Sequence, residues 1–166
     1  MKNLFFNIFL LGFSIQTFAQ ITVLPEVDIS VNYKYLDAVN TSDDAESVKM
    51  LHEKVAFYDL KNSELYSDEY DNYYVTFYVP EGKILAAYNS EGEIIRTIEK
   101  FKNIKLPQGA KESVSQRFPG WIMEKDVYRV SYNTSRDGTT KEQYQIKLKN
   151  GDETIRVKVD PNGNFL

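Results

Sequence analysis

The chain contains no cysteine and only one histidine, His52. Without cysteine there is no disulfide, no thiolate metal ligand and no thiol nucleophile. Stability must therefore come from a packed hydrophobic core, which a chain of this length can form without covalent cross-links.

A single histidine also restricts catalytic chemistry. His52 would be the only base available to a Ser–His or Cys–His pair, and it lies inside a helical pattern with no accompanying motif. One histidine without cysteine does not support a zinc site. The Gly-rich phosphate-binding patterns of P-loop and dinucleotide-binding folds are missing as well. The sequence therefore predicts no catalytic residues, no metal ligands, no cofactor and no enzymatic activity.

Carboxylates gather in residues 68–71, where Asp68, Glu69 and Asp71 follow one another in a polar stretch. Oxygen ligands of this kind suit a hard cation such as Ca²⁺. A solvated loop is the simpler interpretation, and the sequence leaves weak cation binding open.

The first 19 residues have the pattern of a secretory signal peptide. Lys2 precedes an apolar run over residues 4–13, and Thr17 and Ala19 are the small residues expected just before a cleavage site. This run is too short to span a bilayer. We therefore expect cleavage after Ala19, a mature chain without an integral membrane segment, and a periplasmic or secreted location.

The charge of the chain is uneven. The formal net charge is −4, acidic residues outnumber basic ones in residues 20–106, and basic residues are in excess in residues 107–166. Binding to nucleic acid requires clustered cations that displace counterions from phosphate. A net acidic chain gives no sign of such a cluster, so the sequence predicts no nucleic-acid partner.

Apolar residues recur at helical spacing in two places. The first helix follows residues 41–44, which are suited to capping, and the second begins at residues 107–110 and ends before Pro119. Residues 21–35 alternate poorly and contain Pro25, so they are expected to be an edge strand or an extended segment. Trp121, just beyond the second helix, is expected to anchor that helix in the core.

Period-two alternation follows each helix. Residues 73–79, 84–88 and 94–101 form one set of predicted strands, and the last strands of the chain repeat the order of strand, glycine turn and strand. Glu46-Ser47-Val48 and Glu112-Ser113-Val114 open the two helices in the same way. These patterns predict an α+β fold of tandem helix-plus-antiparallel-sheet units, with the helices packed on one face of a curved sheet. The expected organisation is a signal peptide (1–19), a first unit (20–106) and a second unit (107–166).

The second unit resembles a known family. A short helix ends in Phe118-Pro119, a tryptophan follows, and a Tyr-x-Val-x-Tyr strand begins at Tyr128 and precedes a closing hairpin near Gly163. In these features residues 110–166 resemble the PepSY-like, β-lactamase-inhibitor-like periplasmic proteins, whereas the first unit matches only weakly. The resemblance implies an exported module of tandem helix-plus-sheet units that binds or inhibits a partner.

Alternation also indicates which residues the sheet turns away from the helices. Tyrosine and arginine are common at protein interfaces. Tyrosine also has a high β-propensity, so exposed tyrosines on a strand do not by themselves require a partner. The predicted partner-binding residues are Tyr74, Thr76, Tyr78, Gln145, Lys147, Arg156 and Lys158. The favoured hypothesis is a non-enzymatic, exported module that presents this face to an envelope or extracellular protein or peptide. A small envelope hydrolase that uses carboxylates and a purely structural domain are the alternatives.

Overall fold

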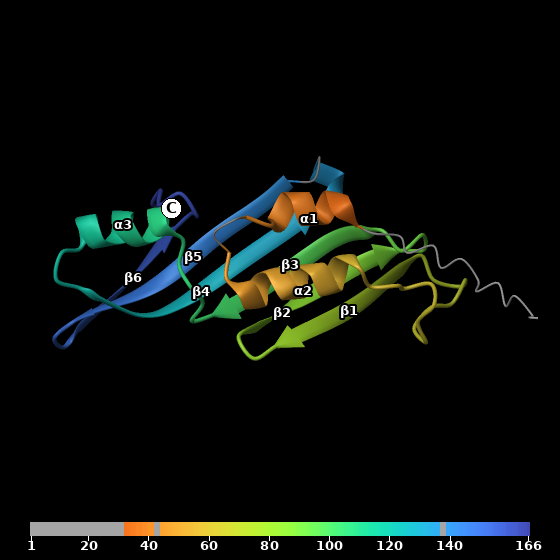
Figure 1. Ribbon diagram of the computed structural model, residues 1–166, viewed down its shortest axis with the longest axis horizontal. Helices are drawn as coiled ribbons and strands as arrows, with labels where there is room; N and C mark the ends of the chain where they lie inside the picture. The colour runs from red at the N-terminus through yellow and green to blue at the C-terminus, as the bar shows by residue number, and fades with distance from the viewer. Residues whose placement is uncertain (1–31, 42–43, 137–138) are drawn as a thin grey trace, which may run out of the picture.

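The computed structural model describes residues 32–41, 44–136 and 139–166 (Figure 1). Its helices are α1 (Tyr33–Val39), α2 (Glu46–Ala56) and α3 (Gln108–Arg117), with a short 3₁₀ turn at Thr134–Arg136. Its strands are β1 (Asn72–Val79), β2 (Gly82–Asn89), β3 (Ile94–Lys102), β4 (Ile122–Asn133), β5 (Thr139–Asn150) and β6 (Glu153–Val159). The expected signal peptide lies outside the described residues.

All six strands form one open antiparallel sheet in the order β1-β2-β3-β4-β5-β6. A helix precedes each run of three strands, and pairing of β3 with β4 joins the two runs. In Figure 1, α2 lies over the first strands and α3 lies beside β5 and β6 at the other end. The predicted α+β class is therefore confirmed.

The hydrophobic core lies between the helices and one face of the sheet. Val48, Leu51 and Val55 of α2 are buried, as the helical spacing predicted, and so are Ala110 and Val114 of α3. Alternate strand residues meet them in a single cluster that includes Phe77, Ile84, Phe101, Tyr128, Ile146 and Leu148. Burial of each large apolar side chain contributes roughly 1.5–3 kcal/mol to stability.

The expectation of an extended segment is wrong for its last residues, because Tyr33–Val39 forms α1. Tyr35 and Val39 are spaced by four residues, so a helix buries both on one face. Asn32 holds the start of this helix in place. Its side-chain amide donates to the Gly92 carbonyl oxygen at 3.1 Å, and its Oδ1 accepts from the Ile94 N–H at 2.7 Å. Residues 21–31 of the expected segment lie outside the described residues.

The capping residues expected before α2 do not cap it through their side chains. The N-cap is Ala45, which has no side-chain acceptor, while Asp44 Oδ2 accepts from the Thr41 N–H at 2.8 Å. The Asp44 carboxylate therefore stabilises the turn before the helix. In contrast, α3 ends at Arg117 with Phe118 as its C-cap, as the following proline predicted.

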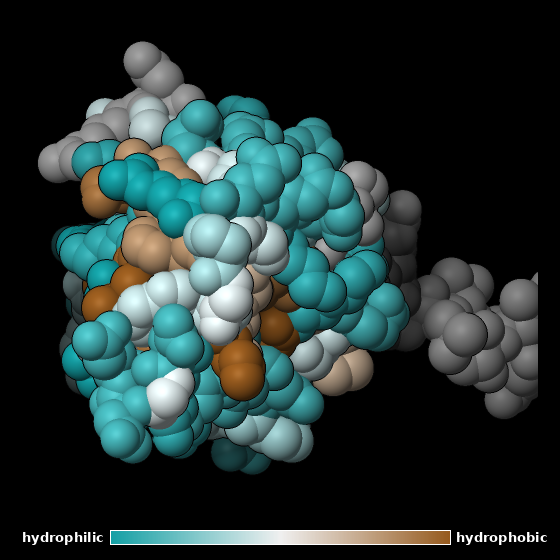
Figure 2. Space-filling view, turned by 90° about the vertical axis from the view of Figure 1, so that its left-hand side faces the viewer, coloured by the Kyte–Doolittle hydropathy of each residue, from teal (hydrophilic) through white to brown (hydrophobic). Residues whose placement is uncertain are grey.

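Trp121 lies at the edge of the core instead of inside it. The side chain is half-buried and packs against Phe118, whose ring in turn contacts Phe165. Seen from the end of the molecule that carries α3, apolar residues are grouped in the middle of a mostly polar surface (Figure 2). The expectation that Trp121 is a core anchor is therefore only partly met.

No helix in the described part of the chain combines the length and the apolar character needed to cross a membrane.

Candidate functional site: the open face of the sheet

One face of the sheet is not covered by any helix of the described residues, and we call it the open face. The seven residues predicted for partner binding all belong to it by strand register and by alternation with buried neighbours. Tyr74 and Tyr78 are 71% and 66% exposed. Gln145 lies opposite Lys158, and Lys147 lies opposite Arg156.

These seven residues do not form one compact site. Tyr74, Thr76 and Tyr78 are on the edge strand β1, whereas the other four are on β5 and β6. Because neighbouring strands are about 4.8 Å apart, the four steps from β1 to β5 separate the two groups by about 19 Å. A small ligand cannot span that distance, so the open face is suited to a macromolecule.

Sequence reasoning missed most of the cations between the two groups. The open-face positions of β2 to β6 carry Lys83, Arg96, Lys100, Lys102, Lys125, Arg129, Lys141, Lys147, Lys149, Arg156 and Lys158. No Asp or Glu occupies an open-face register position on the six strands, all of which are described. The open face is therefore strongly cationic, although the net charge of the whole chain is negative.

One carboxylate reaches this surface from an irregularity in β4. The pairing of β4 with β5 shifts between Met123 and Lys125, and Glu124 in this bulge forms an ion pair with Lys147 at 2.5 Å. The hydrogen bond from Lys147 lowers the pKa of the Glu124 carboxyl. The remaining cations of the open face have no ion-pair partner among the described residues.

The open face is also hollowed. A cavity of about 600 Å³ lies over the middle strands, lined from the open face by Ile98, Arg129, Ser131, Lys141 and Gln143. Ile98 is 47% exposed, so an apolar floor lies beside two cations. Such a hollow can accept a partner's side chain.

The sequence did contain a signal for the missed cations. Lys100 and Lys102 alternate with the buried Phe101, and Arg129 stands between the buried Tyr128 and Val130. The alternation of buried and exposed residues along each strand therefore indicates on which face of the sheet each of these cations lies. The order of the strands was needed to bring Lys83, Lys100 and Arg129 side by side.

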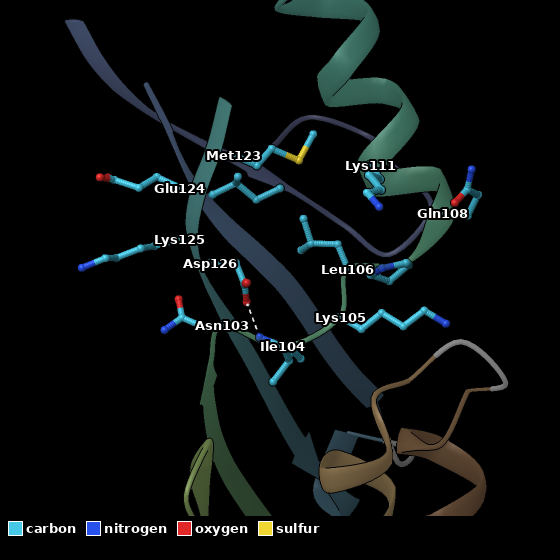
Figure 3. Close-up of a pocket in the computed structure, with 12 residues that line it drawn as sticks. Asn103, Ile104, Lys105, Leu106, Gln108, Lys111, Met123, Glu124, Lys125 and Asp126 are labelled. Atoms are coloured by element: carbon cyan, nitrogen blue, oxygen red, sulfur yellow. Dashed lines mark hydrogen bonds between the residues drawn. The ribbon is translucent and has the colours of Figure 1, made fainter. Parts of the chain in front are cut away.

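A second depression lies on the helix side, where the segment 103–107 leaves β3 and crosses the start of β4 (Figure 3). It has a volume of about 440 Å³, and Ile104, Leu106, Met123 and Ile146 line it with apolar surface. Lys111 of α3 lies at its upper end in Figure 3. Asp126 is nearly buried in it and accepts a hydrogen bond at Oδ2 from the Ile104 N–H at 3.3 Å.

Burial raises the pKa of the Asp126 carboxyl, and the hydrogen bond from Ile104 offsets this only in part. A carboxyl whose pKa is raised by folding costs stability once it ionises, above the unfolded value of about 3.9. We expect Asp126→Asn to raise the free energy of unfolding by up to about 1 kcal/mol at pH 7, and to have no such effect at pH 3. Urea denaturation at the two pH values measures this, with the exposed Asp152→Asn as control. An equal gain at both pH values would contradict the assignment.

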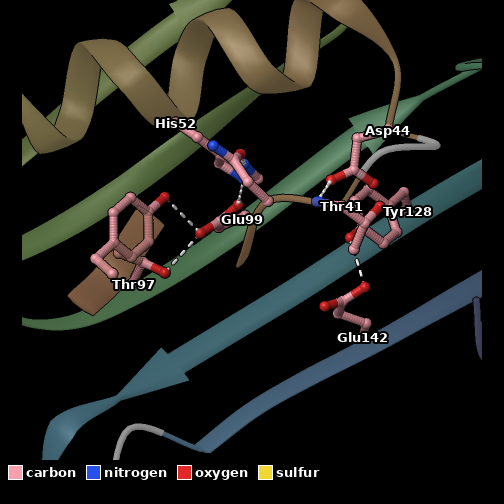
Figure 4. Close-up of polar contacts among 9 residues, drawn as sticks. Thr41, Asp44, His52, Thr97, Glu99, Tyr128 and Glu142 are labelled. Atoms are coloured by element: carbon pink, nitrogen blue, oxygen red, sulfur yellow. Dashed lines mark hydrogen bonds and ion pairs between the residues drawn. The ribbon is translucent and has the colours of Figure 1, made fainter. Parts of the chain in front are cut away.

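The only histidine belongs to a buried polar network (Figure 4). His52 Nε2 lies 2.6 Å from Glu99 Oε2, and its Nδ1 lies 2.8 Å from Asn40 Oδ1. Glu99 Oε1 accepts from the Tyr35 hydroxyl at 2.9 Å and from the Thr97 hydroxyl at 2.7 Å. Burial raises the pKa of Tyr35 well above its usual value. Both side chains of the His52–Glu99 pair are fully buried, so the pair ties α2 to β3 out of reach of a substrate, and the Tyr35 hydroxyl ties α1 to the same carboxylate.

The acidic residues 68–71 lie in the loop between α2 and β1, where Asp68, Glu69 and Asp71 are exposed. The described residues contain no group of three or more His, Asp or Glu side chains arranged to hold a metal ion.

Comparison with known proteins found no matching family model, no similar curated protein and no similar solved structure.

Proposed function

We propose that this chain is a non-enzymatic binding module that docks a protein or peptide through the open face of its sheet. The observation that carries the proposal is the composition of that face. Among the described residues no helix covers it, and it exposes tyrosines at one edge and cations over the rest, of which only Lys147 has an ion-pair partner in the described part of the chain. Aromatic residues and arginine are enriched in protein interfaces, and exposed aromatic side chains on a rigid sheet lose little entropy on binding.

The expected signal peptide assigns this module to the periplasm or to the extracellular medium. Its partner would then be another envelope or extracellular protein. The resemblance of residues 110–166 to PepSY-like, β-lactamase-inhibitor-like proteins points to the same class of binding or inhibitory activity.

A hydrolase is less well supported. The single histidine has no exposed surface, and both of its ring nitrogens have partners, the buried Glu99 and the Asn40 side chain. Of the carboxylates on the helix face of the sheet, Glu99 and Asp126 are buried and Glu142 accepts a hydrogen bond from the Tyr128 hydroxyl at 2.9 Å. These groups are held within the fold, and none of them forms a nucleophile–base pair at the surface.

The proposal predicts that Tyr78→Ala combined with Arg156→Ala weakens capture of a partner from an envelope extract. Because both residues are exposed, the denaturation midpoint should change little, by the equivalent of less than about 0.5 kcal/mol per substitution. Immobilised wild-type and variant proteins are compared for the partner bands that they retain.

The matched control is Tyr33→Ala with Lys34→Ala on α1, which removes the same kinds of side chain from an exposed position on the helix side. Capture should be unchanged in this control. If the two double variants lose capture equally, or if neither does, the open face is not the docking surface.

A further inference from the structure

The cations of the open face stand directly opposite one another across the strands. Lys83, Lys100 and Arg129 follow one another on β2, β3 and β4, and we call them the first cation row. The second cation row consists of Lys125 on β4, Lys147 on β5 and Arg156 on β6, which also lie directly opposite one another. Within a row neighbouring strands are about 4.8 Å apart, and on β4 the two rows are four residues, or about 13 Å, apart.

Such an arrangement is unfavourable for the protein alone. Like charges placed directly opposite each other destabilise a sheet, and soluble surfaces usually intersperse the two signs. Here the strands supply no acidic residue at any open-face position, and Glu124 neutralises only Lys147. An anionic ligand would relieve the repulsion between these cations. Binding of such a ligand to the open face would therefore explain why the unfavourable pairs are present.

Building on the proposed function, we propose that the two cation rows bind an acidic polypeptide segment that lies extended along β3, β4 and β5. An extended chain presents alternate side chains about 6.8 Å apart on one side. Open-face positions along each strand recur at the same interval, as do Lys100 and Lys102 on β3 or Lys147 and Lys149 on β5. Acidic residues spaced by two or by four positions in the partner would therefore meet cations without a change of spacing.

Nucleic acid fits this surface less well. Proteins that bind single strands place aromatic side chains among the cations so that the bases can stack. The open-face positions of β3 to β6 carry no aromatic residue. The exposed Tyr74 and Tyr78 lie on the edge strand β1, where Tyr78 stands opposite Lys83 at one end of the first cation row, so aromatic side chains do not alternate with the cations. The residues around the rows, such as Ser131, Gln143 and Gln145, are suited to hydrogen bonds with a peptide backbone.

The test uses a fluorescent peptide of six Glu-Ser repeats, with six Gln-Ser repeats as the neutral probe. Binding to the full chain is measured by fluorescence anisotropy at several salt concentrations. One variant replaces Lys100, Lys125, Arg129 and Arg156 with glutamine. The control variant makes the same change at Lys34, Lys54, Lys61 and Lys111, which are exposed elsewhere, so both variants have the same net charge.

We expect the glutamate peptide to bind the wild type, to be released as salt increases, and to bind the row variant at least about tenfold more weakly. The control variant should change affinity less than about twofold, and the neutral peptide should not bind. Absence of binding to the wild type, or an equal loss in both variants, would overturn the inference.

Two further probes separate the partner classes. A twelve-nucleotide thymidine strand and heparin are measured against the same variants. If either binds through the rows more tightly than the peptide, the acidic polypeptide is the wrong ligand. If the row variant captures envelope partners normally while the Tyr78 and Arg156 variant does not, the inference fails and the proposed function stands.

Discussion

Replacing Glu99 with alanine is expected to lower the free energy of unfolding by about 3–5 kcal/mol. The carboxylate accepts from the Tyr35 and Thr97 hydroxyls and pairs with His52, and all four side chains belong to the core beneath the helices. Removing this acceptor leaves the Tyr35 and Thr97 hydroxyls and one ring nitrogen of His52 buried without partners, which is the costly way to break such a network. Chemical denaturation followed by circular dichroism measures the change.

Two variants control for this effect. Glu99→Gln keeps an oxygen acceptor for the two hydroxyls, so it should cost less than the alanine variant. Glu53→Ala removes a carboxylate from the exposed side of α2 and should change stability by less than about 0.5 kcal/mol. If Glu99→Ala cost less than about 1 kcal/mol, the network would not hold α1 and α2 to the sheet.

Gly163→Ala should be among the most damaging glycine substitutions in the described part of the chain. Gly163 has a φ of +88°, and a Cβ there would collide with the Gly109 carbonyl oxygen and the Ser113 Oγ of α3. The left-handed conformation alone costs an alanine about 1–2 kcal/mol, and overpacking typically costs another 1–3 kcal/mol. We expect a loss of about 2–5 kcal/mol in the free energy of unfolding.

Gly92→Ala is the matched control. Gly92 has nearly the same φ, +84°, but no atom lies within 4 Å of a Cβ built on it. Its substitution should therefore cost only the conformational part, about 1–2 kcal/mol. Equal losses at the two positions would mean that the closing hairpin does not press against α3. A larger loss at Gly163, measured by denaturation midpoint and slope, would support that close contact.

The fold places acidic and basic residues on opposite faces of the sheet, and the proposed function depends on this separation. The acidic groups of the strands lie on the helix side of the sheet, where Glu99 and Asp126 are buried, or in the bulge of β4. The cations are turned outward on the opposite face. A meander permits this because alternation places neighbouring residues on opposite faces, so one strand can serve the core and the binding surface together.

Local sequence determined the elements of this protein and the face of each strand residue. The stripe of Val48, Leu51 and Val55 specified α2, Pro119 ended α3, and period two placed Tyr74, Tyr78, Lys147 and Arg156 on the open face. These properties depend on hydrophobic spacing and on backbone geometry within a few residues, which one sequence contains in full.

Only the tertiary structure decided which of those residues are neighbours. Helix α1 formed where the sequence indicated an extended segment, because burial of Tyr35 and Val39 against β4 and β5 outweighs local preference. The partnership of His52 with Glu99 joins residues that are 47 positions apart. The two cation rows depend on strand order and register, which long-range pairing determines, so the sequence alone revealed separate lysines and arginines but not the continuous cationic surface.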